Sequence, residues 1–268
     1  MAFWTYNGLK FGIKSVKFPK EKDFYDGFIS SINVDIKKCL NFIEKSNETE
    51  QYCRECEHIC PTESINISKL LNQSELTAKD GLKVIDAEKC IFCGLCIDAC
   101  IKVNISNGGA INYVNEFDFS IRNQKSYAAE NIFKKSLFVK HIDTGSCGAC
   151  ESEINALNNP YYNMHRLGIF ITPSPRFADV LLVTGVFTEK MTKVFFNVLD
   201  NIPRPRFIIL AGSCAITRGI YENKEKTPLN ENYIKLLETE NIISLPHCPP
   251  NPFEILNVLL LIKNGELK

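Results

Sequence analysis

The chain has 268 residues, of which 45% are hydrophobic and 23% charged, a composition typical of a globular protein with one or two packed domains. Lysine plus arginine equals aspartate plus glutamate at 31 each, so the charge balance gives no reason to expect nucleic acid as a partner. The longest apolar run, residues 255–262, is interrupted by Asn257 and is far shorter than the ~20 residues that cross a bilayer, so it is not a membrane span.

Residues 1–38 mix aromatic side chains such as Trp4 and Phe18 with lysines such as Lys10 and Lys14. This mixture suits an extension that lies on a partner or at a membrane surface, and it equally suits an arm that docks on its own domain. The first residues lack the basic stretch, apolar core and small-residue cleavage site of an export signal. We therefore expect a cytoplasmic location.

Residues 39–118 contain eight of the twelve cysteines and only short apolar pieces, at residues 82–85 and 110–114. Twelve cysteines are many more than packing needs, and a reducing compartment argues against six disulfides, so metal ligation is the better explanation. The polar stretch at residues 122–135 lacks a wide apolar face and is interpreted as a connecting helix or linker. We place the domain boundary there, with a first domain over residues 1–125 and a second over residues 126–268.

The second half alternates short apolar runs with helical patterns. The apolar runs predict buried parallel strands at residues 137–142, 169–172, 180–184, 207–211 and 242–245. Helical spacing predicts helices at residues 189–199 and 232–237, and Pro252 precedes a closing helix at residues 253–263. This order predicts an α/β domain with a mostly parallel sheet, whose sites lie at the carboxyl ends of the strands.

The most regular cysteine group is the run CIFCGLCIDAC, which has the C-x2-C-x2-C-x3-C spacing of bacterial ferredoxins. Its members are Cys90, Cys93, Cys96 and Cys100. The close spacing lets three thiolates surround one cluster while the fourth reaches a neighbouring cluster. Zinc sites favour two C-x2-C pairs separated by a longer loop, so this run indicates iron and sulfide.

The first cysteine group has the last three positions of the same run, Cys53, Cys56 and Cys60, but the preceding cysteine, Cys39, is thirteen intervening residues away instead of two. A polar loop of that length can bulge outward and still return Cys39, because loop closure becomes only slowly more unfavourable with length. The two-cluster rule then assigns Cys39, Cys53, Cys56 and Cys100 to one cluster and Cys60, Cys90, Cys93 and Cys96 to the other. Without Cys39, the first cluster would lose an iron or use another ligand.

The third group consists of Cys147, Cys150, Cys214 and Cys248. All four follow predicted strands, so a parallel sheet would bring them to one edge as a third ligand set. Two other interpretations of the cysteines and their loops stay open: a flavoprotein, because DTGS after the first strand could hold a flavin phosphate at a helix N-terminus, and an interaction module stabilised by zinc.

With these residues in place, the second half resembles the small, cluster-bearing subunit of membrane-bound group 4 [NiFe] hydrogenases and its relative, the 20 kDa-type subunit of respiratory complex I. The segments that match are SCGACESEI, PSPRFADVLLVTG, LAGSCAITRG and CPPNPFEIL. The first half, from GLKFGIKSVKFP onward, is similar to the two-cluster ferredoxin subunit of the same assemblies. The chain thus resembles a fusion of two neighbouring subunits, which implies an α+β ferredoxin-like dicluster domain followed by an α/β flavodoxin-like domain.

The resemblance implies three [4Fe–4S] clusters, of which the one held by the third group lies closest to the reaction site of a partner subunit. The C-x2-C spacing of Cys147 and Cys150 is that of the hydrogenase branch, whereas complex I relatives carry adjacent cysteines. The implied function is an iron–sulfur electron-transfer subunit of a membrane-associated oxidoreductase. The alternative keeps the same role in a complex that lacks nickel and reduces quinone or a sulfur compound.

The partners implied are a hydrogenase-like or complex I 49 kDa-like large subunit, membrane-embedded subunits and soluble ferredoxin, which would hold the chain peripherally on the inner face of the membrane. Glu151 and Glu153 are candidates for proton transfer to the partner's site, and capping of the helix that follows Cys150 is the competing interpretation. His247 stands where the family usually has glycine. It would tune the cluster or couple it to protons, or simply pack and bond to the backbone.

Overall fold

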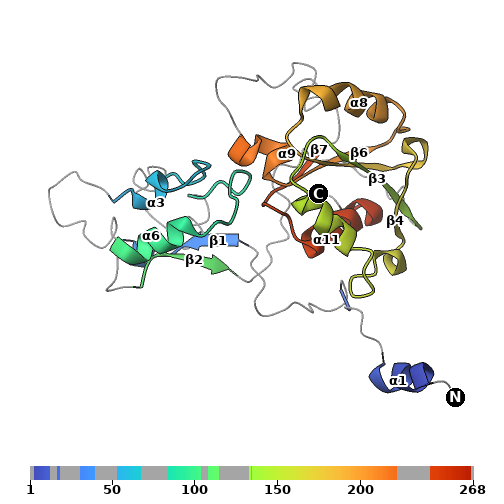
Figure 1. Cartoon of the computed structure of the whole chain (residues 1–268), viewed down its shortest axis with the longest axis horizontal. Coiled ribbons are helices and arrows are strands. Elements are labelled where there is room, and N and C mark those ends of the chain that lie inside the picture. The colour runs from blue at the N-terminus through green and yellow to red at the C-terminus, as the bar shows by residue number, and fades with distance from the viewer. Residues whose placement is uncertain are drawn as a thin grey trace.

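The computed structural model describes residues 3–12, 17–18, 31–39, 53–67, 84–103, 108–114, 133, 135–221 and 242–266. Figure 1 shows two bodies within these ranges. One is built on a two-stranded sheet and the other on a five-stranded sheet. Three predictions concern residues outside these ranges. They are the helix at residues 232–237, the domain boundary after residue 125 and most of the linker at residues 122–135.

The first body has little regular structure around a small core. β1 (Ser31–Val34) pairs antiparallel with β2 (Ile111–Val114), and the short helix α3 (Glu55–His58) packs against α6 (Leu95–Val103). An isolated bridge joins Ile65 to Ile85. The core consists of Ile32, Val34, Ile65, Ile67, Val84, Ile85 and Ile111 together with Cys56, Cys90 and Cys96. Cysteines therefore occupy positions that aliphatic side chains would fill in an ordinary core.

The second body contains a parallel five-stranded sheet in the order β4-β3-β5-β6-β7. The strands are β3 (Leu137–Asp143), β4 (Ile169–Ile171), β5 (Val180–Thr184), β6 (Phe207–Ala211) and β7 (Ile242–Leu245). Counted within this body, the order is 2-1-3-4-5, which is that of flavodoxin-like sheets. The predicted parallel sheet is confirmed, and each strand agrees with its predicted range to within one residue.

Helices cover both faces of this sheet because its strands are apolar on both sides. In β5, Val180 and Leu182 face one core and Leu181 and Val183 face the other, as strand geometry requires. The first core is completed by α7 (Ala149–Ala156) and α11 (Pro252–Asn264), and the second by α8 (Glu189–Asp200) and α9 (Ser213–Thr217). Short 3-10 turns complete the body: η3 (Met164–Leu167), η4 (Pro175–Phe177) and η5 (Gly219–Tyr221).

The closing helix α11 begins and ends at residues that are typical of helix termini. The Asn251 side chain accepts hydrogen bonds from the backbone of Phe253 and Glu254, and the Glu254 carboxylate accepts one in return from the Asn251 backbone, which is a capping box. Pro252 occupies the first turn, where its missing N–H has no cost. Gly265, with a φ of 68°, ends the helix. Both this helix and α8 are confirmed.

The N-terminal residues behave in two ways. Helix α1 (Phe3–Phe11) buries none of its residues and projects from the molecule (Figure 1). Phe18, by contrast, is buried in the second body, where its ring lies 5.5 Å from that of Phe253 and its carbonyl accepts a hydrogen bond from Arg166. Part of the predicted arm therefore docks on the protein itself. Within the described ranges, no helix combines the length and apolar character needed to cross a membrane.

Candidate metal centres

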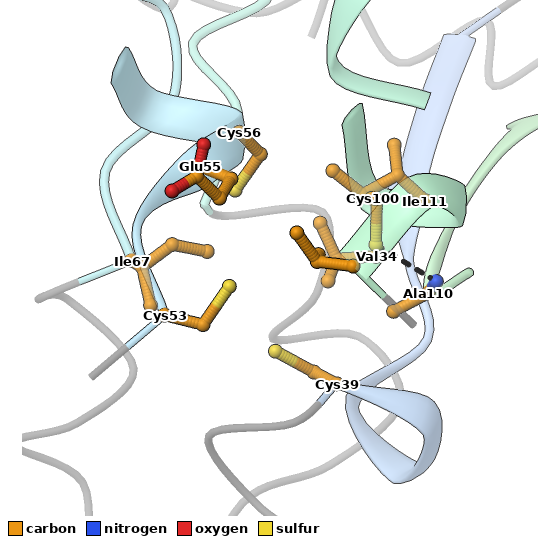
Figure 2. A pocket seen from close by; sticks show the side chains of 10 residues that line it. Val34, Cys39, Cys53, Glu55, Cys56, Ile67, Cys100, Ala110 and Ile111 are labelled. Atoms are coloured by element: carbon orange, nitrogen blue, oxygen red, sulfur yellow. Dashed lines mark hydrogen bonds between the residues drawn. The ribbon is translucent and has the colours of Figure 1, made fainter. Parts of the chain in front are cut away.

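Four cysteines from separate segments line one cavity of the first body. They are Cys39, Cys53, Cys56 and Cys100. Their sulfurs point toward a shared space in Figure 2, and the other lining residues are mostly aliphatic, including Val34, Ile67 and Ile111. The set is the one assigned to the first cluster by the two-cluster rule, and it includes Cys39 despite its irregular spacing.

Local structure explains how Cys39 reaches this cavity. The Asp35 carboxylate accepts a hydrogen bond from the Lys37 backbone and so caps a single 3-10 turn, η1 (Ile36–Lys38). Cys39 closes that turn, with its N–H bonded to the Ile36 carbonyl. On the opposite wall, Cys100 Sγ accepts a hydrogen bond of 3.1 Å from the Ala110 backbone. Such N–H donors stabilise a thiolate and tune the potential of a bound cluster.

A second cavity is bounded by residues of the same small core. It is lined by Cys60, Cys90, Cys93 and Cys96, along with aliphatic residues such as Ile32 and Ile85. Cys60 Sγ accepts a backbone hydrogen bond from Ser64 at 3.3 Å, and the hydroxyls of Ser64 and Thr62 lie 3.2 and 3.7 Å from it. Nothing in the cysteine spacing marks Thr62 or Ser64, so their contacts with Cys60 were not predictable from the sequence.

Burial dominates the acidity of the cysteines in these cavities. It raises the pKa of Cys56 and Cys96 to about 12 and that of Cys90 to about 11, with neighbouring cysteines contributing in the same direction. For Cys60, burial also acts to raise the pKa, but the hydrogen bonds from Ser64 and Thr62 outweigh it and the pKa is lowered. The buried thiols are therefore protonated at neutral pH on their own, and a bound metal is what makes them thiolates.

The arrangement fits a cluster better than a single ion. No three His, Cys, Asp or Glu side chains in the described residues come close enough together to share one metal ion. The cysteines instead surround cavities of about 390 and 320 Å³, volumes that include solvent at their mouths. In an iron–sulfur cube each iron takes one thiolate, so the four ligands enclose a volume and do not meet at a point. Four thiolates with an apolar wall match that requirement.

The third group gathers at the carboxyl edge of the five-stranded sheet. Cys147 and Cys150 follow β3, Cys214 lies in α9 directly after β6, and Cys248 follows β7. The Sγ atoms of Cys214 and Cys248 form a hydrogen bond, which raises the pKa of Cys214 and lowers that of Cys248 to about 7. The sheet thus brings together residues up to about a hundred positions apart in the chain.

Gly212 is the point of closest approach in this third site. A Cβ atom built on Gly212 would lie 2.7 Å from Cys150 Sγ, a separation that real side chains do not show. Its φ of +93° also lies in the region that favours glycine. Glycine is therefore required here both by the backbone and by the sulfur beside it.

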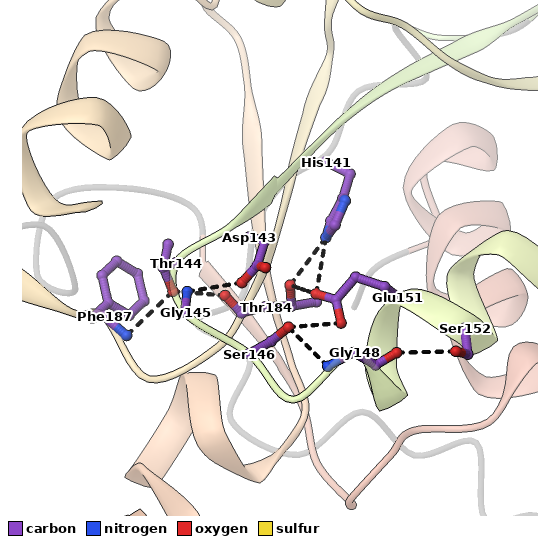
Figure 3. Close-up of polar contacts among 10 residues, drawn as sticks. All are labelled: His141, Asp143, Thr144, Gly145, Ser146, Gly148, Glu151, Ser152, Thr184 and Phe187. Atoms are coloured by element: carbon purple, nitrogen blue, oxygen red, sulfur yellow. Dashed lines mark hydrogen bonds and ion pairs between the residues drawn. The ribbon is translucent and has the colours of Figure 1, made fainter. Parts of the chain in front are cut away.

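A polar network fixes the loop that carries Cys147 (Figure 3). The Glu151 carboxylate accepts hydrogen bonds from the hydroxyls of Ser146 and Thr184, and His141 Nε2 lies 3.7 Å from it. Burial lowers the pKa of His141, partly offset by the nearby Glu151. Glu153, two residues further along α7, is half-buried, and burial raises its pKa. Glu151 thus fastens the loop to β5 through these hydroxyls, whereas no side chain of the described residues caps the N-terminus of α7, at Gly148.

The second site, in the first body, contacts the third site, in the second body, through residues that adjoin their cysteines. Ser213 Oγ donates a buried hydrogen bond of 3.2 Å to the Cys90 carbonyl, and Thr217 Oγ1 donates one of 3.4 Å to the Glu88 carbonyl. The ring of Phe92 lies 4.4 Å from that of His247. These contacts join residues more than 120 positions apart, so no local sequence signal could have predicted them.

Two protein-family models match the chain. Residues 51–104 match the 4Fe-4S dicluster domain, and residues 147–262 match the 20 kDa subunit of NADH ubiquinone oxidoreductase. An uncharacterized protein of Methanocaldococcus jannaschii is 33% identical over 128 residues, which cover 46% of this chain and 84% of that protein. A probable membrane-bound hydrogenase subunit of Pyrococcus furiosus is 32% identical over 127 residues, covering 47% and 74%. This chain belongs to the 20 kDa-subunit family of NADH ubiquinone oxidoreductase.

A further relative in the 20 kDa-subunit family is formate hydrogenlyase subunit 7 of Escherichia coli, which is 34% identical over 139 residues, or 50% of this chain and 51% of that protein. The resemblance stated from the sequence is confirmed, including its two parts. The dicluster match and the membership of the 20 kDa-subunit family indicate that iron–sulfur clusters are the cofactors of this chain.

Proposed function

We propose that this chain is the iron–sulfur electron-transfer subunit of a membrane-associated oxidoreductase, and that it relays electrons between ferredoxin-type clusters and a hydrogenase-like catalytic subunit. The observation that carries the proposal is the grouping of the twelve cysteines into three sets of four. Two sets each line one cavity, and the third gathers at the edge of the parallel sheet. Clusters of this type supply one-electron oxidation and reduction when bound.

In this proposal each set holds one [4Fe–4S] cluster, three in all. Cys39, Cys53, Cys56 and Cys100 hold the first, Cys60, Cys90, Cys93 and Cys96 the second, and Cys147, Cys150, Cys214 and Cys248 the third. The protein contributes the thiolates, apolar walls that exclude water, and hydrogen bonds from Ser64 and Ala110 to the sulfurs. The second site lies between the other two, because it shares a small core with the first and touches the third.

The proposed partners are a hydrogenase-like large subunit, membrane-embedded subunits that hold the chain on the inner face of the membrane, and soluble ferredoxin. Support comes from the relatives named as hydrogenase and formate hydrogenlyase subunits and from the C-x2-C spacing of Cys147 and Cys150. The large subunit encoded with this chain tests the choice. Two CxxC motifs near its ends would support a nickel site, and their absence would move the proposal to the quinone or sulfur-compound alternative.

Anaerobic purification tests the cofactor assignment directly. We expect a brown protein with about twelve irons and about twelve sulfides per chain, since each cube has four of each. Electron paramagnetic resonance of the reduced protein should resolve three interacting signals. A colourless protein containing zinc would refute the proposal, and a flavin absorbance spectrum would favour the flavoprotein interpretation.

Glu153 is the better of the two candidates for proton transfer to the partner's site. Burial raises the pKa of Glu153, which makes its carboxyl easier to protonate. The Glu151 carboxylate, by contrast, already accepts hydrogen bonds from two hydroxyls. We expect Glu153→Gln to lower the turnover of the intact complex and leave its iron content unchanged. Turnover equal to that of the wild type would remove Glu153 from the proton path.

A further inference from the structure

The loops of the second and third sites meet through residues that each adjoin a cysteine. Phe92 lies between Cys90 and Cys93, and His247 immediately precedes Cys248. Their rings are 4.4 Å apart between centroids and inclined by 37°. The contact therefore joins one cysteine loop of each site without any intervening residue.

Both residues hold a backbone conformation that side chains rarely adopt. The φ angle is +54° at Phe92 and +86° at His247, in the region where glycine is favoured. Strained residues of this kind persist where the surroundings over-determine them, and they gather at functional sites. Glycine would satisfy the backbone at His247 more easily, so the side chain itself needs an explanation.

Hydrogen bonds within the second body hold His247 in place. Its Nδ1–H donates to the Glu254 carboxylate, whose two oxygens lie 3.2 and 3.0 Å away. Glu254 is itself held by the Asn251 backbone as part of the capping box at the start of α11. The His247 carbonyl accepts a hydrogen bond of 2.9 Å from the Ser213 backbone. With only 8% of its surface exposed, His247 is rigidly mounted on the second body with its ring against the first.

We propose that His247 and Phe92 form an interdomain latch, in which His247 is a positioning residue that sets the separation and orientation of the second and third sites. The inference rests on the proposed function, since the two sites matter as neighbours only if both hold clusters. The hydrogen bonds from Ser213 to the Cys90 carbonyl and from Thr217 to the Glu88 carbonyl provide two points of attachment, which leave rotation about the line through them. The ring contact provides a third point of attachment, and three points fix the orientation.

The experiment uses the full chain, purified anaerobically with its clusters and reduced, and measures the magnetic interaction between the second and third sites by electron paramagnetic resonance. His247→Gly removes the ring and relieves the backbone, so the variant should fold and keep its iron. We expect its splitting from the interaction between the sites to be lost or reduced. His247→Phe keeps a ring beside Phe92 and should restore the splitting, whereas Phe92→Leu should reduce it as His247→Gly does.

The matched control is Asn163→Gly, which also replaces a residue of positive φ, here +46°, at the start of η3 away from the cysteine loops. It should keep the wild-type splitting. Wild-type protein without three cluster signals would defeat the proposed function itself. Three signals with the same splitting in wild type, His247→Gly and Phe92→Leu would overturn only the latch. A loss of iron in His247→Gly would also overturn the latch, because the ring would then be needed to hold a cluster and not to orient the two sites. A loss of splitting in Asn163→Gly would overturn it too, because the splitting would then not report on the ring contact.

Discussion

Replacing Cys39 with alanine should convert the first cluster to a three-iron form and leave the other two intact. The cavity would keep Cys53, Cys56 and Cys100, which in the proposed arrangement bind three irons, and the fourth iron would lose its only thiolate. The three-iron form has its own paramagnetic signal in the oxidised protein, where the four-iron form has none. The iron content should therefore fall by about one atom per chain, while the signals of the other sites persist.

The neighbouring exposed Lys37 offers a control for this substitution. Lys37→Ala keeps the backbone N–H that the Asp35 carboxylate binds, so the turn leading to Cys39 should form as before. This variant should retain all its iron and show no three-iron signal. If Cys39→Ala also retained a complete first cluster, another residue would have to be the ligand, and the irregular spacing of the first cysteine group would be explained by a different fourth ligand.

The second large effect is expected at Gly212. Gly212→Ala would place a methyl group 2.7 Å from the present position of Cys150 Sγ and would also strain a backbone whose φ is +93°. The strain alone costs about 1–3 kcal/mol, and the methyl group must in addition push a ligand sulfur away from its site. We expect the iron content to fall from about twelve to about eight atoms per chain, with loss of the third signal only.

Gly148→Ala separates the two causes. Gly148 has a similar φ of +86°, but a Cβ atom there would meet no other atom within 4 Å. This variant should unfold at lower denaturant concentration than the wild type and keep its third cluster signal. Equal loss of iron in both variants would show that backbone strain, and not the approach of the sulfur, makes glycine necessary at residue 212.

The elements that the sequence predicted well carry their information locally. The central strands β5 and β6 are almost wholly apolar runs because both their faces are buried, and α11 has an Asn cap, a proline and a terminal glycine in its own segment. The pairing of cysteines across the two ferredoxin-type runs was predictable for a similar reason. A fixed spacing forces the fourth cysteine of each run toward the other site, and the two cavities have those compositions.

Features formed by distant segments were not predictable. β1 has only four residues, and its partner β2 lies about eighty positions later, so nothing local distinguishes it from an arm. The hydrogen bond from Ser213 to Cys90 and the ring contact of Phe92 with His247 depend on how the two bodies meet. Glu151 looked equally suited to proton transfer and to capping, but in the structure it accepts hydrogen bonds from the Ser146 and Thr184 hydroxyls, a role that the sequence did not indicate.

The docking of Phe18 affects any attempt to divide this protein into two polypeptides. A cut near residue 125 would leave Phe18 on the ferredoxin-like fragment, although its ring packs on Phe253 and its carbonyl binds Arg166 in the other fragment. The α/β fragment alone would then expose an apolar site on its surface. Separately expressed halves should therefore bind each other, because Phe18 of one fragment fills the apolar site beside Phe253 of the other.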